Sequence, residues 1–363
     1  MLRIVHIRIC RSKSEAPFRL IMLHISEQEP ILRASSRRRE SVRAIQDWLQ
    51  LGIEESRKGG YGFFSRCHAW LYVGIFIVLG YLVSTFFRPK RDAIVSELSE
   101  IYPHVPEMAV QKKIELDAYT KQEYLGKGFD LGAGNGAVGG ILIRQKHVSH
   151  LHGFDAVPQA ELAQENGYTD YTSANVEGVP LPDETFDFGI SICVLEHVED
   201  IGAALKEASR ILKPNGTFYF STPAPEFRKA TLGYRLWSTL GLQQRADRYA
   251  RYRDDHACHY HYFDKGIWVG VLQDCGYDDI CAVPIFSAAQ MLVYDLLNYS
   301  VHTPRIYINE HLAQILAARP RLRARMVVAT ESISAWAAEF QVTADNATHY
   351  FISAKKTESP DSR

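Results

Sequence analysis

The stretch KGFDLGAGNG, from Lys127 to Gly136, constrains the fold more than any other part of the chain. A short apolar segment leads to an acid, Asp130, and glycines follow at alternate positions, Gly132 and Gly134 being the first two. Glycines let a backbone approach a ligand closely, in torsions that a Cβ atom would forbid. We therefore expect a strand, a ligand-binding turn and a helix, with the carboxylate of Asp130 beneath the turn to accept hydrogen bonds from its N–H groups or to hold an ammonium group.

Three more segments follow in order. They are GFD at 153–155, NVEGVPLPDETFD at 175–187 and RILKPNG at 210–216. Together with the glycine-rich turn they resemble the motifs of the class I methyltransferases, and among these the type 11 methyltransferases, which transfer a methyl group from S-adenosylmethionine. The resemblance covers about residues 125–225 and a helical segment at 268–277.

The resemblance implies which residues contact S-adenosyl-L-methionine as the cofactor. They are Asp130, Gly132, Ala133, Gly134 and Gly136 in the turn, Asp155 and Ala156, Asn175 and Val176, and Cys193. Asp155 would accept hydrogen bonds from the ribose hydroxyls. Asn175 stands where many relatives have Asp, and an amide carbonyl can also accept a hydrogen bond from the adenine amino group. The turn alone also fits a nicotinamide-binding fingerprint, but dehydrogenases have no counterpart of the 175–187 segment.

Alternating apolar and helical segments predict an α/β fold with a doubly wound, mostly parallel sheet. We expect strands at 128–131, 149–154, 170–172, 186–192, 217–221, 280–286 and 349–354, and helices at 92–102, 111–124, 137–144, 158–165 and 202–212. The resemblance implies that the last of seven strands is reversed. Two segments, 224–263 and 287–346, exceed what the sheet needs and are expected to cap the site and select the substrate. Ligands collect at the carboxyl ends of the strands.

Composition sets limits on partners and compartment. The chain is 46% hydrophobic with a net charge of −1, so no basic field favours nucleic acid as a partner. Its cysteines include no C-x-x-C pair and look like reduced thiols. We divide the chain into a basic leader of residues 1–68, a hydrophobic helix at 69–87, a methyltransferase domain at 92–355 and a polar tail at 356–363.

The segment from Ala69 to Phe87 contains no charged residue. As a helix it would be about 28 Å long, close to the thickness of a bilayer's hydrocarbon core. We therefore expect a membrane anchor that either spans the bilayer or lies within one leaflet, with the catalytic domain facing the cytoplasm. The alternative is a helix buried in the protein.

The sequence CVLEH, Cys193 to His197, resembles the E-x-x-E-H element of quinone-ring O-methyltransferases, in which Glu and His bind a metal or act as the base. Glu196 and His197 are therefore the expected catalytic residues, with His197 as the general base. Cys193 replaces the first Glu and removes an oxygen ligand, so no metal is expected. The alternative is that Glu196 and His197 only order the start of a helix.

Two other patterns argue against particular chemistries. His256, His259 and His261 suggest zinc, but no companion ligand stands at a recognised spacing and we expect none there. No Asn/Asp-Pro-Pro-Tyr/Phe element follows the fourth predicted strand, which disfavours methylation of a planar amino group.

These observations predict O-methylation of a membrane-borne small molecule, such as a lipid-soluble phenol or quinone precursor or a lipid-linked sugar. One alternative is C- or N-methylation of a lipid or metabolite. Another is a non-catalytic subunit that binds S-adenosylmethionine and acts as a scaffold. The oligomeric state stays open.

Overall fold

The computed structural model describes residues 62–298 and 312–358, which fall into two compact units. The first comprises Ile114–Leu292 and the chain from Gln341 onward; the second comprises the described residues up to Lys113 together with Val293–Phe340. Most of the predicted leader, residues 299–311 of the second cap segment and the end of the tail lie outside the described residues.

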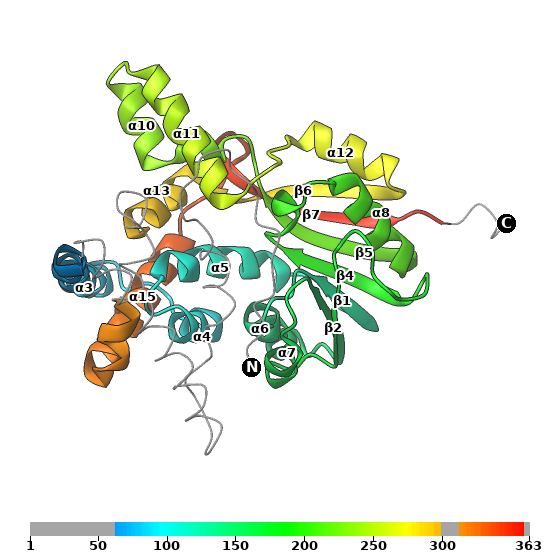
Figure 1. The fold of residues 1–363 in the computed structure, drawn as a ribbon, viewed down its shortest axis with the longest axis horizontal. Coiled ribbons are helices and arrows are strands. Elements are labelled where there is room, and N and C mark those ends of the chain that lie inside the picture. The colour runs from blue at the N-terminus through cyan, green and yellow to red at the C-terminus, as the bar shows by residue number, and fades with distance from the viewer. Residues whose placement is uncertain (1–61, 299–311, 359–363) are drawn as a thin grey trace. The chain divides into compact units, whose positions relative to one another are not determined.

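The first unit contains a seven-stranded sheet in the order β3-β2-β1-β4-β5-β7-β6 (Figure 1). Its strands are β1 (Lys127–Leu131), β2 (His150–Asp155), β3 (Asp170–Ser173), β4 (Phe186–Ile192), β5 (Leu212–Pro223), β6 (Tyr277–Ser287) and β7 (Ala347–Lys356). The pairs among β1 to β5 are parallel, whereas β7 runs antiparallel to both β5 and β6. The predicted doubly wound sheet with a reversed last strand is confirmed.

One helix precedes these strands and others connect them. They are α5 (Pro106–Tyr119), α6 (Ala137–Lys146), α7 (Ala160–Glu165), the 3-10 helix η1 (Leu195–His197), α8 (Ile201–Ile211), α9 (Phe227–Ala230), α10 (Leu232–Thr239), α11 (Gln243–Ala257), α12 (Lys265–Asp274) and α13 (Ala288–Leu297). Right-handed crossovers leaving β1 in one direction and β4 in the other place α6 and α8 on opposite faces of the sheet, as Figure 1 shows.

The core between the sheet and its helices is largely aromatic and aliphatic. Phe129, Phe218 and Phe220 are fully buried, and Trp268 of α12 packs on Phe220 with ring centroids 5.0 Å apart. The side chains of Asp200 and Asp264 cap α8 and α12 by accepting a backbone N–H in each first turn. The same helices therefore carry both a buried face and a defined start.

Asn215, which takes the place of a glycine in the related motif, lies near the start of β5. Its φ is 63°, in the left-handed region that Asn tolerates better than most residues. Asn is therefore compatible with the backbone conformation at this position.

The second unit contains α3 (Gly62–Phe86), α4 (Ala93–Ile101) and α15 (Pro320–Ala338). α3 packs against α15 so closely that a Cβ atom on Gly80 would lie 2.4 Å from the Cβ of Ala329. On the same helix Val73 and Phe76 are buried, and the Tyr72 hydroxyl donates to the carbonyl of Leu297. One face of α3 is thus a protein-packing face.

These contacts correct the expected transmembrane anchor at 69–87. Among the residues that the structure describes, no helix combines the length and apolar character needed to cross a bilayer. The segment instead forms most of α3, with one face against α15 and another on which Ile75, Val78 and Leu82 are exposed. A long uncharged run can serve a helix–helix contact, and the sequence alone does not distinguish the two uses.

Candidate active site

The glycine-rich turn between β1 and α6 has the torsions that the sequence predicted. The φ values of Gly132, Gly134 and Gly136 are 81°, 54° and 77°, all in the left-handed region. A Cβ atom on Gly132 would lie 2.4 Å from the side chain of Val194, whereas one on Gly134 would meet nothing within 4 Å. Open space therefore adjoins the backbone of Gly134, and a ligand there would lie against the turn. We call this space beside Gly134 the cradle.

Two N–H groups of the turn donate to a backbone carbonyl and not to Asp130. The N–H groups of Gly132 and Ala133 donate to the carbonyl of Phe154, at 2.8 and 3.0 Å. The buried carboxylate of Asp130 instead accepts from the Tyr168 hydroxyl at 2.5 Å. Burial and the neighbouring Asp130 hold the pKa of Tyr168 well above its usual value, so Tyr168 stays a donor. Sequence reasoning missed Tyr168, because no motif contains it.

Asp155, the last residue of β2, reaches back to the turn. Its carboxylate accepts from the N–H of Gly134 and from that of Val157, both at 2.9 Å. Burial raises the pKa of this carboxyl, and the two hydrogen bonds oppose the rise. Ala156 and Asn175 lie exposed just beyond β2 and β3. The acid is thus beside the cradle, and its ribose contact stays a prediction.

Arg210 fixes the segment that follows β3. Its guanidinium donates to the carbonyls of Val179 and Leu181, at 2.9 and 2.8 Å, and to the carboxylate of Glu207. Glu207 in turn accepts from the N–H of Val179 at 2.6 Å, and the hydrogen bond from Arg210 lowers the pKa of its carboxyl. This fork holds the loop expected to line the adenine against α8.

Replacing Arg210 by Ala should lower the free energy of unfolding by about 1 to 3 kcal/mol, because two backbone carbonyls lose a charged donor together. Arg210→Lys is the matched variant, since it keeps the charge but not the planar fork. Urea unfolding of both variants tests this. If both variants had the same free energy of unfolding as the unchanged protein, the guanidinium of Arg210 would have no role in holding the loop after β3.

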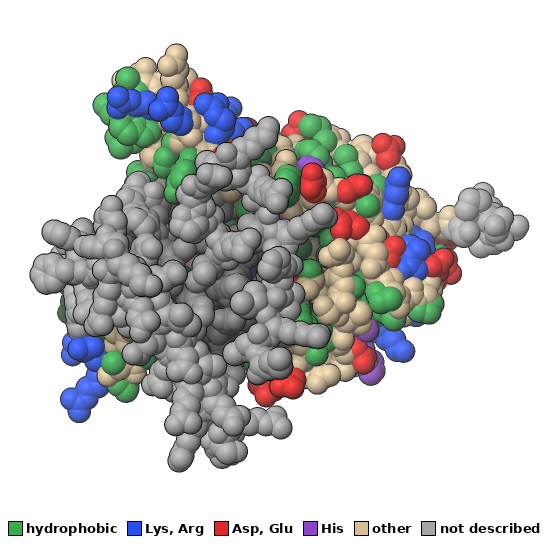
Figure 2. Space-filling model, viewed as in Figure 1, with side chains coloured by type: hydrophobic (Ala, Val, Ile, Leu, Met, Phe, Trp, Pro, Cys, Tyr) green, Lys and Arg blue, Asp and Glu red, His purple; other side chains and the backbone are tan. Residues whose placement is uncertain are grey.

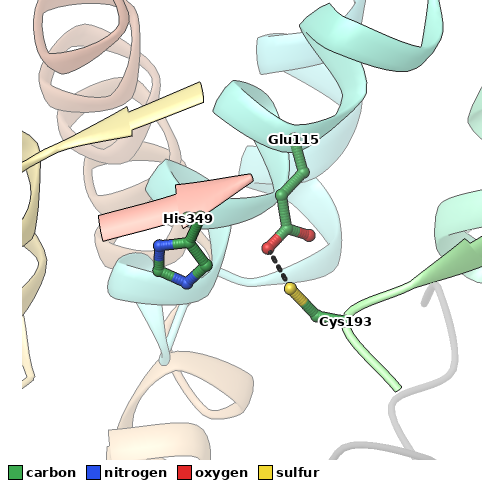
Figure 3. A group of neighbouring side chains, drawn as sticks. All are labelled: Glu115, Cys193 and His349. Atoms are coloured by element: carbon green, nitrogen blue, oxygen red, sulfur yellow. Dashed lines mark hydrogen bonds between the residues drawn. The ribbon is translucent and has the colours of Figure 1, made fainter. Parts of the chain in front are cut away.

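At the end of β4, Cys193 meets two residues that are remote in the sequence. Its φ is 52°, and its Sγ donates to Oε1 of Glu115 on α5 at 2.8 Å. One ligand atom each of Glu115, Cys193 and His349 lies within 4.8 Å of the others. Figure 3 shows the three side chains meeting from α5, the end of β4 and β7. Sequence reasoning missed Glu115 and His349, because neither stands in a recognisable motif.

A second group lies just after Cys193 in the chain. Glu196 and His197 form η1, and with His259 they place one ligand atom each within 4.8 Å. Nδ1 of His197 lies 3.3 Å from the carbonyl oxygen of Cys258. Because a carbonyl only accepts, Nδ1 carries the proton and Nε2 carries the lone pair. The expected base therefore has its basic nitrogen defined by the fold, with Nε2 3.9 Å from the carboxylate of Glu196.

His259 is held in the same tautomer. Its Nδ1 lies 2.8 Å from the Tyr262 hydroxyl, which itself donates to Asp254, so Nδ1 must be the donor. The pKa of His259 lies well below its usual value because the ring is buried and because positive charges on His197, His349 and Arg253 would face it. His259 is therefore neutral near pH 7.

The two histidines of the HxxHxH pattern whose side chains the structure describes, His259 and His261, have different partners. Nε2 of His261 lies 2.8 Å from the carbonyl of Val198, which makes this nitrogen a donor, and the side chain of His256 lies outside what the structure describes. His259 instead faces His197, with ring centroids 4.8 Å apart.

The depressed pKa of His259 predicts acid sensitivity. The unfolded chain takes up this proton near pH 6.5 and the folded chain does so only at lower pH, so stability is present above about pH 6.5 and is lost as the pH falls. Urea unfolding at about pH 7.5 and about pH 5 should show a fall that is smaller in His259→Gln, whose amide can still donate to Tyr262. An unchanged fall in the variant would assign the acid sensitivity to other groups.

Comparisons with known proteins agree with this geometry. Residues 129–220 match the methyltransferase domain family. The chain is 30% identical over 131 residues to malonyl-[acyl-carrier protein] O-methyltransferase of Halorhodospira halophila, a match that covers 34% of this chain and 43% of that protein. It is 42% identical over 64 residues to the ubiquinone/menaquinone biosynthesis C-methyltransferase UbiE of Rickettsia massiliae, covering 18% of this chain and 24% of that protein.

Among solved structures, a SAM-dependent methyltransferase from Thermotoga maritima aligns with a TM-score of 0.41 and 17% identity, covering 68% of this chain and 92% of that one. The chain spans less than half the length of the two curated relatives named above. The family match over 129–220, together with the similarity to these two relatives, indicates that this part of the chain is an S-adenosylmethionine-dependent methyltransferase domain.

Proposed function

We propose that this chain transfers a methyl group from S-adenosylmethionine to an oxygen atom of a small-molecule acceptor. The observation that carries the proposal is that a space for the cofactor and a histidine suited to act as the base lie at the same end of the sheet. The turn at Gly134 with Asp155 forms a cradle on one side, and a histidine with a defined basic nitrogen, His197, follows β4. The two ends lie beside each other because β1 pairs with β4.

The residues of the cradle fit the cofactor. Open space at Gly134 admits a ligand against the backbone, and the carboxylate of Asp155 offers acceptors for a pair of hydroxyls. Exposed Asn175 offers an amide for a base edge. S-adenosylmethionine, when bound, supplies a methyl group on a positively charged sulfur.

His197 would remove the proton from the acceptor hydroxyl. Nε2 carries its lone pair, and neighbouring His259 is neutral, so it adds no positive charge that would lower the basicity of His197. Glu196 is buried beside the ring, and a carboxylate there favours the imidazolium that forms. Methyl transfer then depends mainly on holding the nucleophile in line with the sulfonium.

The relatives supply one O-methyltransferase and one C-methyltransferase, so C-methylation is the second candidate. The full chain should be incubated with a membrane lipid extract and S-adenosylmethionine carrying a deuterated methyl group. We expect a labelled product whose fragmentation places the label on oxygen. A label on carbon would establish the second candidate. Cofactor binding without any labelled product would favour the non-catalytic scaffold.

We further propose that the chain works at a membrane surface that faces the cytoplasm, where a lipid-soluble phenol or quinone or a lipid-linked sugar is available. Part of the support is the hairpin of α10 and α11, on which Figure 2 shows hydrophobic and basic side chains side by side. Leu236, Leu240 and Leu242 are 53%, 60% and 40% exposed, and the exposed residues Arg235 and Arg245 flank them in the sequence. Apolar side chains with nearby arginines suit the interface of an anionic bilayer. In the second unit, the exposed side chains of α3 add a further apolar face.

Flotation with phosphatidylglycerol-containing vesicles tests this surface. Leu236→Ser combined with Leu240→Ser should reduce the bound fraction at least about tenfold, because burying each leucine contributes about 1.5 to 3 kcal/mol. Ile267→Ser on α12 is the matched control, since Ile267 is 47% exposed in the same unit. Equal binding of all three proteins would contradict a role for the hairpin.

A further inference from the structure

The group formed by Glu115, Cys193 and His349 has the donors of a transition-metal site. It combines a thiol, an imidazole and a carboxylate, and one ligand atom of each lies within 4.8 Å of the others (Figure 3). Glu115 and His349 are buried, and Cys193 is half-buried. A sulfur, nitrogen and oxygen set of this kind suits zinc and does not suit magnesium or calcium, which prefer oxygen ligands alone.

The residue next to His349 sets its tautomer. The hydroxyl of Thr348 donates to the carbonyl of Phe286 at 3.0 Å, and its oxygen lies 3.1 Å from Nδ1 of His349. Since the hydroxyl proton is already used, Nδ1–H is the donor and Nε2 carries the lone pair. An imidazole whose second nitrogen donates to a neighbour is the usual state of a metal-binding histidine.

The spacing of the group is also compatible with one ion. Ligand atoms around a tetrahedral zinc lie about 3.4 to 3.6 Å apart, given metal–ligand bonds of about 2.0 to 2.3 Å. The Cys193 sulfur and the Glu115 carboxylate, 2.8 Å apart, would separate by less than about 1 Å to admit it. The three residues come from α5, the end of β4 and β7, so the fold itself fixes the site.

We propose that Glu115, Cys193 and His349 bind a zinc ion through one ligand atom each, leaving a fourth position for an oxygen atom. On binding, the S–H bond of Cys193 breaks, sulfur bonds to the metal and the proton leaves to solvent. This assignment departs from the expectation of no metal. That expectation considered Glu196 and His197 beside Cys193 and, separately, the histidines at 256, 259 and 261.

The fourth position suggests which acceptors the site would take. Cys193 ends β4 beside the strand that carries the glycine-rich turn, so the ion lies at the same end of the sheet as the cradle. An acceptor with a phenolic or enolic oxygen could occupy the open position, where the ion would lower the pKa of that oxygen. This role rests on the proposed function, whereas the binding of the ion does not.

Cobalt titration of the full chain, purified without a metal-affinity step and treated with chelator, tests the site directly. We expect one equivalent of Co²⁺ to bind with a thiolate-to-cobalt charge-transfer band, and zinc to displace it. Cys193→Ser should abolish the band, and Glu115→Gln and His349→Gln should each weaken binding at least about tenfold. Cys281→Ser is the matched control, because Cys281 is an exposed free thiol on β6. Thr348→Val should weaken binding about tenfold while leaving all three ligands in place.

Urea unfolding of the same variants shows that each is folded. No cobalt binding above that of Cys193→Ser would overturn the inference. Cobalt binding that shows no charge-transfer band and is lost in His259→Gln would also overturn the inference. Such a result would place the metal at the neighbouring group of Glu196, His197 and His259. Metal bound in a chain that forms no methylated product would leave the inference standing and remove the proposed function. Methylated product from a chain that binds no metal would do the reverse.

Discussion

Asp155→Ala is expected to weaken S-adenosylmethionine binding by about 1 to 3 kcal/mol, or about 5- to 150-fold. The carboxylate accepts from the N–H of Gly134 at 2.9 Å, so the substitution removes both the predicted ribose acceptor and a hydrogen bond that orders the turn. Calorimetry with S-adenosylmethionine and S-adenosylhomocysteine measures the effect. Asp170→Asn is the control, because Asp170 is an exposed acid at the opposite end of its strand from the cofactor site.

The raised pKa of Asp155 adds a dependence on pH. Hydroxyl groups that donate to the carboxylate favour its charged form, so binding releases a proton wherever the free protein holds Asp155 protonated. Affinity should therefore fall as the pH falls through the raised pKa of the free protein, and Asp155→Asn should lack this fall. Unchanged affinity in Asp155→Ala would move the ribose contact to another residue.

The sheet was predictable because its signals are local. β4 covers Phe186–Ile192, the same residues that the apolar run predicted, and the glycines of the turn mark torsions that few other residues adopt. The reversed β7 followed from resemblance alone, since periodicity does not give strand direction. The resemblance also identified Asp155, because this acid ends a strand beside a glycine-rich turn.

The residues and contacts that could not be predicted are those between positions far apart in the sequence. Glu115 lies 78 positions from Cys193, on a helix ahead of the first strand, and its side chain carries no motif. Tyr168 donates to Asp130 across 38 positions. The environment of α3 could not be predicted for the same reason, because an apolar helix has the same sequence pattern whether it faces lipid or another helix. The close approach of Gly80 to Ala329 depends on where α15 packs.

His197→Ala is expected to lower kcat by at least about tenfold, with little change in the affinity for S-adenosylmethionine. The carbonyl of Cys258 fixes the proton on Nδ1, so the substitution removes a basic Nε2 that the fold has already oriented. Single-turnover methyl transfer to the acceptor separates this effect from binding. His150→Ala is the matched control, an exposed histidine at the start of β2.

The pH profile distinguishes a base from a structural residue. If His197 takes the acceptor's proton, the rate in the unchanged protein should rise with pH as the imidazole loses its proton, and His197→Ala should lose that rise as well as the rate. Adding free imidazole should restore part of the rate to the variant. His197 is only half-buried, so imidazole from solvent can enter the volume that its side chain leaves. A variant with normal turnover would show that Glu196 and His197 only order η1, and that the acceptor reaches the site already ionised.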